Sequence, residues 1–210
     1  MREFSSAAFL PLVLAGCCGK SEPPKPLLPS AAPTARASAS ASAAPSTRAS
    51  AAPQEGVEQK ATLAEAFAFA RPQMADTEDE SDKGSWTLAR WMALHPSWAA
   101  VAALPASSVP KVVKDPETER GRRICEPGRV AWIRALPGDG PKVFQGVFQT
   151  NDIRYLSFIA VGSTGEVVDN SVATFCGVVT GLLTFSNNSG GKTQSARVVG
   201  LFDLPENRKK

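Results

Sequence analysis

Histidine and tyrosine are almost absent from this 210-residue sequence, since each occurs once, as His95 and Tyr155. A zinc site is normally built from several histidine and cysteine ligands, and no cysteine pair lies near His95. No serine or cysteine can be assigned to this histidine as an activated nucleophile. We therefore predict no metal, no cofactor and no enzymatic activity, and we interpret His95 as a residue at the end of a helix.

An excess of either sign of charge is also lacking in the part of the sequence that can form a core. Lysine and arginine occur 18 times between Glu55 and Lys210, and aspartate and glutamate also occur 18 times. The net charge of +3 therefore comes from the first 54 residues. Nucleic-acid binding usually requires a strongly basic surface, so we expect no nucleic-acid partner.

Two charged clusters in this region have a simple interpretation. The basic cluster at 120–123 lies beside Glu117 and Glu119, which favours a mixed, solvated surface. The acidic run at 76–82 lacks the alternating ligands and the central glycine of a calcium-binding loop. We predict that both clusters are solvated and hold no ligand.

Long hydrophobic runs are missing as well. Near the N-terminus, Ala7 to Ala15 forms an apolar run of nine residues after Arg2. A transmembrane helix needs about 20 apolar residues, whereas 7–15 suit the hydrophobic region of a secretory signal peptide. The run therefore predicts export from the cytoplasm.

The end of this run, Leu14-Ala15-Gly16-Cys17, resembles the lipobox of bacterial lipoproteins. The resemblance implies cleavage after residue 16 and attachment of lipid, including palmitate, to Cys17. Several acyl chains anchor a protein stably to the lipid bilayer. We expect a cell-envelope protein, on the outer membrane or its periplasmic face in a Gram-negative cell. The alternatives are an ordinary signal peptide with a chance cysteine and, for Cys18, a second lipid site or an inert thiol.

Residues 17–56 are expected to be a disordered tether. The segment Ser30–Pro53 contains only alanine, serine, proline, threonine and arginine, so it cannot bury enough apolar surface to fold. The residue pattern changes after the tether and again near residue 119. These changes divide the remaining chain into a short helical region at 57–118 and a strand-rich domain at 119–210.

Capping patterns mark three short helices in the first of these regions. Thr62 and Glu65 form a capping box before a helix that ends ahead of Pro72. Ser85 is expected to cap a second helix that ends near Leu94, and Ser97 a third helix over 98–103.

Five strands are predicted in the second region, separated by turns rich in glycine, proline, asparagine and aspartate. The turns leave no room for crossover helices, so most pairings should be antiparallel, in a meander or a small barrel. The expected strands are Arg122–Cys125 continuing through Arg129–Ala135, Lys142–Thr150, Ile153–Val161, Ser171–Phe185 and Ser195–Phe202.

The segments Gly128-Arg-Val-Ala-Trp-Ile133 and Phe175-Cys-Gly-Val-Val-Thr-Gly181 place glycines within apolar strands. Because of these two segments, the run from Gly121 to Phe202 resembles OB-fold-like domains of bacterial envelope and nucleic-acid proteins. This resemblance implies an α+β protein with short N-terminal helices and a mostly antiparallel five-stranded OB-like barrel. The sequence departs from the family because only 162–170 is available for the helix between strands three and four.

Cys125 and Cys176 form an even pair in a domain that we expect to be exported, which suggests one disulfide bond. The OB-like resemblance places them on neighbouring first and fourth strands. The alternative is a pair of buried free thiols.

Trp132 and Tyr155 are the candidate ligand-binding residues, on strands that we expect to be adjacent. Their rings are able to stack on a sugar or a peptide, although packing of at least one ring in the core is the more ordinary interpretation. We predict a non-enzymatic envelope module that binds a protein or a polysaccharide. The alternatives are a hydrolase or transferase acting on cell-wall material and a structural subunit of an envelope complex. An exposed aromatic patch would favour binding, and a cleft with converging carboxylates would favour catalysis.

Overall fold

The computed structural model describes residues 56–78, 82–138, 140–186 and 190–209. The expected signal peptide, Cys17, Cys18 and nearly all of the tether lie outside the described residues. No described helix is long and apolar enough to cross a membrane. The described helical elements are η1 (Val57–Gln59), α1 (Leu63–Ala70), η2 (Arg71–Gln73), α2 (Lys83–Leu94), α3 (Trp98–Ala102), α4 (Val109–Lys114), α5 (Pro116–Glu119) and α6 (Pro205–Arg208). The described strands are β1 (Arg123–Ala135), β2 (Val143–Thr150), β3 (Tyr155–Val161), β4 (Val172–Ser186) and β5 (Lys192–Phe202).

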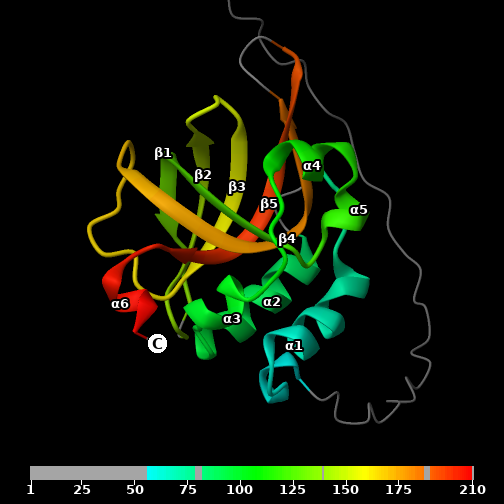
Figure 1. Cartoon of the computed structure of the whole chain (residues 1–210), viewed down its shortest axis with the longest axis vertical. Helices are drawn as coiled ribbons and strands as arrows, with labels where there is room; N and C mark the ends of the chain where they lie inside the picture. The colour runs from blue at the N-terminus through cyan, green and yellow to red at the C-terminus, as the bar shows by residue number, and fades with distance from the viewer. Residues whose placement is uncertain (1–55, 79–81, 139, 187–189, 210) are drawn as a thin grey trace, which may run out of the picture. The chain divides into compact units, whose positions relative to one another are not determined.

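The five strands form one sheet that closes on itself in the order β1-β2-β3-β5-β4 (Figure 1). All pairings are antiparallel except β3 with β5, which is parallel. The predicted α+β class and the mostly antiparallel pairing are confirmed. A simple meander would pair β3 with β4, whereas here the β4–β5 hairpin places β5 beside β3.

Apolar residues gather on both sides of this sheet. Inside it, Phe148, Phe158, Phe175 and Phe202 are fully buried, and the Phe158 ring centroid lies 5.1 Å from that of Phe175 and 5.4 Å from that of Phe202. Val112 of α4 belongs to this inner cluster. A helix that precedes β1 in the chain therefore contributes to the inner core.

A second cluster lies on the outer side, between helices α1–α3 and the sheet. Leu88 and Met92 of α2 pack with Ile159 of β3 and with Val199 and Leu201 of β5. Figure 1 shows α1–α5 gathered near β4 and β5. The helices thus cover only part of the outer surface of the sheet.

Local capping explains where the helices begin. Thr62 accepts a hydrogen bond from the Glu65 amide, and Ser97 accepts one from the Ala100 amide, as predicted. The predicted cap of α2 is wrong, since Asp82 caps this helix by accepting from the Ser85 amide at 2.8 Å. The Ser85 hydroxyl instead donates to the Thr180 hydroxyl of β4 at 2.7 Å.

Asp82 also takes part in a buried ion pair that attaches the start of α2 to the sheet. Its Oδ2 lies 3.6 Å from Arg197 Nη1, and the two side chains are only 1% and 3% exposed. Arg197 further donates to the Ala75 carbonyl and the Thr77 hydroxyl. Because removal of one partner would leave a buried charge, this contact couples the 75–85 segment to β5.

A β-bulge in β4 is stabilised by residues from the helical region. The register of β4 against β5 shifts between Val179 and Gly181, and Gly181 has a φ of +150°. Asp76 Oδ1 accepts from the Leu182 amide at 2.7 Å, and Arg120 Nε donates to the Thr180 carbonyl at 2.9 Å.

Asp76 and Arg120 also contact each other at 2.7 Å, and only 8% of the Arg120 side chain is exposed. The prediction that both charged clusters are solvated is therefore wrong for Asp82 and Arg120, whereas Asp76 is partly exposed and also binds the fold. Their carboxylate and guanidinium groups bind backbone groups of the fold itself.

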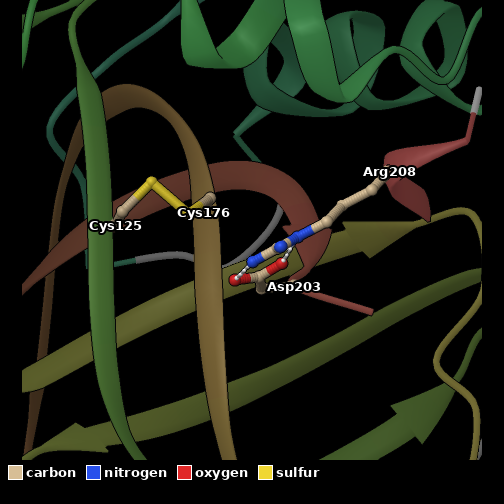
Figure 2. Close-up of a disulfide and its surroundings, with 4 residues drawn as sticks. All are labelled: Cys125, Cys176, Asp203 and Arg208. Carbon is tan, nitrogen blue, oxygen red and sulfur yellow. Dashed lines mark hydrogen bonds and ion pairs between the residues drawn. A yellow bond between two sulfur atoms is a disulfide. The ribbon is translucent and has the colours of Figure 1, made fainter. Parts of the chain in front are cut away.

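Cys125 and Cys176 are directly opposite each other on β1 and β4, with their Cα atoms 4.0 Å apart. Figure 2 shows the disulfide bond between them, so the predicted pairing is confirmed. Cys125 is exposed, whereas Cys176 is buried in the outer apolar cluster. The bond joins two strands that are 51 residues apart in the sequence.

Candidate functional site

The outer surface of β1, β2 and the start of β3 carries the two predicted ligand-binding residues. Three rows of directly paired residues define it: Val172, Arg129, Gln149 and Tyr155; Trp132, Val147 and Ser157; and Arg134, Gln145 and Ile159. Ile159 belongs to the helix-side cluster, so all three rows point away from the inner core. Ser157 is buried. We call the first row together with Trp132, Val147, Arg134 and Gln145 the open sheet face.

A β-bulge determines that Trp132 belongs to this face. The register of β1 against β2 shifts between Val130 and Trp132, so Ala131 is an extra residue. In a regular strand Val130 and Trp132 would share one face, and Val130 points into the inner core. The bulge turns the indole to the outer side, where it is partly exposed.

Tyr155 is also partly exposed, and its ring packs edge-on against Phe185 of β4, with centroids 6.1 Å apart and planes at 80°. Neither Trp132 nor Tyr155 belongs to the buried core, so the more ordinary interpretation of these residues is wrong. The expectation that their strands are adjacent is also wrong, because β2 lies between β1 and β3.

The open sheet face carries two arginines and no carboxylate. Arg129 donates to the Asn170 carbonyl at 2.8 Å. Arg134 is exposed, and its guanidinium carbon lies 5.9 Å from the centre of the Trp132 ring. At the border of the face, Asp169 Oδ1 accepts from the Ile133 amide at 2.8 Å. Although the folding region is neutral as a whole, this surface is therefore cationic and partly aromatic.

Two carboxylates near the β2–β3 turn have shifted pKa values. A hydrogen bond from the Thr150 hydroxyl and contact with Arg154 lower the pKa of Asp152. Burial and, to a lesser extent, the charge of Asp152 raise the pKa of Glu126. Both shifts follow from local contacts at this end of the sheet, and the Asp152 carboxylate is engaged by its neighbours.

Several hollows open on the described surface. One, of about 640 Å³, lies between α2 and the β1–β2 connection, and its acidic residue Glu58 forms an ion pair with Arg90 at 2.5 Å. A second, of about 340 Å³, contains Phe67 and Arg120 in its lining. A third, of about 350 Å³, is shallow and is lined by Trp132 and Arg134 of the open sheet face.

Glu58 is the sole carboxylate among the described residues that line these hollows. Converging carboxylates of the kind that would indicate a hydrolase are therefore not observed in them. Within the described ranges, no group of three or more histidine, cysteine, aspartate or glutamate side chains is placed to hold a metal ion.

His95 is the C-cap residue of α2, as predicted for the end of a helix. Its ring stacks on Trp91 with centroids 4.8 Å apart, and its Nδ1 lies 3.1 Å from the Trp91 carbonyl. This histidine is therefore part of the helix terminus and lies outside the open sheet face.

No protein-family model matches this sequence, and no curated protein is significantly similar to it. The site therefore has to be interpreted from its own geometry. Arg134, Arg129 and Val172 belong to the open sheet face without having been predicted as site residues. Arg134 lies two positions after Trp132, and this period of two is the signal that would have joined them on one side of a strand.

Proposed function

We propose that this protein is a lipid-anchored module of the bacterial cell envelope that binds an envelope protein or polysaccharide through its open sheet face, without catalysing a reaction. The observation that carries the proposal is the partly exposed aromatic and cationic surface around Trp132, which no described helix covers. Its aromatic rings offer flat apolar area, while Gln149 and Arg134 supply polar groups at defined positions.

The strand arrangement supports an OB-like barrel as the scaffold. The order β1-β2-β3-β5-β4, with β4 returning to β1, is a five-stranded closed arrangement of the Greek-key kind. OB-folds bind oligosaccharides and oligonucleotides through the face of strands two and three and the adjoining loops. The open sheet face includes Gln145, Val147 and Gln149 of β2 and Tyr155 of β3, and it extends onto β1 through Trp132 and Arg134. The chain departs from the family because α4, which packs into the inner core, precedes β1.

The anchor and the compartment are supported by two features of the chain. The Leu14-Ala15-Gly16-Cys17 motif predicts lipid attachment at Cys17. The disulfide bond between Cys125 and Cys176 suits an oxidising environment outside the cytoplasm. A lipid on Cys17 would leave about 39 residues of tether before Gly56, enough for a mean span of roughly 35 Å.

Photo-crosslinking in living cells tests the binding surface. Val172 is 75% exposed and lies on the open sheet face, whereas Phe69 of α1 is 37% exposed and lies on the helical side. Benzoylphenylalanine replaces either residue in the full chain, and the cells are irradiated. We expect crosslinked products from position 172 and few from position 69, and a Trp132→Ala change should reduce them.

A discrete new protein band would identify a protein partner, and a heterogeneous product sensitive to glycan-degrading enzymes would identify a polysaccharide. Equal crosslinking at the two positions, or none at position 172, would contradict binding at this face.

The anchor is tested separately by labelling cells with palmitate. Cys17→Ala should abolish incorporation of label and leave the precursor uncleaved. Cys18→Ala serves as the neighbouring control, since cleavage before Cys17 does not require it. Normal palmitate labelling of the Cys17→Ala protein would exclude the proposed anchor.

A further inference from the structure

Two tryptophan–arginine pairs among the described residues differ in one respect. Arg208 lies with its guanidinium carbon 5.6 Å from the centre of the Trp98 ring, and Arg134 lies 5.9 Å from that of Trp132. Arg208 also binds both carboxylate oxygens of Asp203, as Figure 2 shows, with Nη2 and Oδ2 2.6 Å apart. Arg134 forms no ion pair with any described residue.

The surroundings of Arg134 accentuate this difference. The open sheet face has no carboxylate of its own, and the neighbouring Asp169 is engaged by the Ile133 amide. The shallow hollow of about 350 Å³ presents an exposed arginine fork beside an indole, so it offers a positive charge and a flat apolar ring to a ligand with a carboxylate.

From this contrast we propose that the hollow at Trp132 and Arg134 binds an acidic sugar unit of a polysaccharide, with the sugar ring on the indole and its carboxylate on the guanidinium. The inference rests on the proposed function and specifies its ligand class. The ligand carboxylate takes the role that Asp203 has beside Arg208. Gln149 and Tyr155, in the next row of the face, lie where further sugar hydroxyls would pass.

An acidic glycan fits this surface better than a single-stranded nucleic acid. Nucleic-acid binding without sequence preference uses successive aromatic rings and a continuous basic groove. On the open sheet face, Tyr155 is separated from Trp132 by strand β2 and packs against Phe185. The folding region is also electrically neutral, with equal numbers of basic and acidic residues.

Affinity electrophoresis of the full chain, purified in mild detergent, tests the proposal with matched polymers. Polygalacturonate carries one carboxylate per sugar, and its methyl ester has the same backbone with that charge removed. We expect dissociation constants about 10- to 100-fold lower for the acid than for the ester, as for a charge-assisted hydrogen-bonded pair. Arg134→Gln should abolish the preference, and Trp132→Ala should weaken binding of both polymers about tenfold.

Trp98→Ala and Arg208→Gln are the matched controls, because they alter the other pair, and both should bind as the wild type does. Circular dichroism melts verify that every variant is folded. Equal affinity for acid and ester, with both lost in Trp132→Ala, would overturn the carboxylate inference and leave the open sheet face as the binding surface.

Absence of binding to either polymer would also overturn the inference, while the crosslinking experiment decides the proposed function independently. Tighter binding of single-stranded oligo(dT), lost in the same two variants, would overturn it in favour of a nucleic-acid ligand.

Discussion

Asp76 and Glu78 lie in one acidic run, yet the structure assigns them very different energetic roles. Asp76 Oδ1 accepts hydrogen bonds from the Leu182 amide and from Arg120 Nη2, both at 2.7 Å. Among the described residues, Glu78 forms an ion pair only with Lys192. The side chains of Glu78 and Lys192 are 66% and 63% exposed. Replacement of each acid by alanine therefore compares a structural carboxylate with a solvated one.

The expected losses follow from these contacts. A hydrogen bond to a charged group contributes about 1.5–3 kcal/mol, and because 38% of the Asp76 side chain is exposed, water replaces part of this. We expect Asp76→Ala to lower the free energy of unfolding by about 3 kcal/mol. Asp76→Asn retains an acceptor for the Leu182 amide and should lose about half as much. Glu78→Ala should lose less than about 1 kcal/mol, as for an exposed ion pair.

Urea unfolding followed by circular dichroism measures these differences in the purified chain. For a folded region of this size, a loss of 3 kcal/mol corresponds to a decrease in Tm of roughly 6 to 12 °C. The variants should rank with Asp76→Ala least stable, Asp76→Asn intermediate and Glu78→Ala close to the wild type. If Asp76→Ala were no less stable than Glu78→Ala, the bridge between the helical region and the β4 bulge would not contribute to stability.

Three further changes test other parts of the fold. The bond between Cys125 and Cys176 closes a loop with a sequence separation of 51, so its reduction should lower the free energy of unfolding by about 4 kcal/mol. Identical urea titrations with and without reductant would show that the bond does not stabilise the fold. Gly181→Ala should lower the free energy of unfolding by about 2 kcal/mol in the same urea titrations. A Cβ at this position would lie 2.5 Å from Asp76 Oδ1, and the φ of +150° disfavours any residue with a side chain. Unchanged stability of this variant would contradict a strained bulge. Burial raises the pKa of Glu126, so its contribution to stability is present below the ordinary value of 4.5 and is lost as the pH rises through the folded-state pKa. Glu126→Gln should therefore be more stable than the wild type near neutral pH and not at acid pH, and identical urea midpoints near neutral pH would refute this.

Much of the local structure could be predicted from the sequence, because its causes are local. Strand positions follow from short apolar runs between turn residues, and the capping box at Thr62 and the cap at Ser97 begin two helices as expected. The pairing of Cys125 with Cys176 was predictable because these two cysteines form an even pair in a domain that the sequence predicts to be exported. The helices over 109–114 and 116–119 were missed, since they are short and each contains proline in its first turn.

The candidate site depended on interactions that are distant in the sequence. Trp132 points outward only because one extra residue in β1 shifts its register against β2, and a shift of one residue exchanges the two faces of a strand. Asp76 differs from Glu78 only because the β4 bulge, about 100 residues later in the chain, presents a free amide to it. The sequence by itself determined where the five strands, the helices α1 to α3 and the disulfide bond form, but not where α4 and α5 form. The tertiary structure alone decided which side chains lie on the open sheet face, because register and bulges arise from pairing between strands rather than from the residues of one strand.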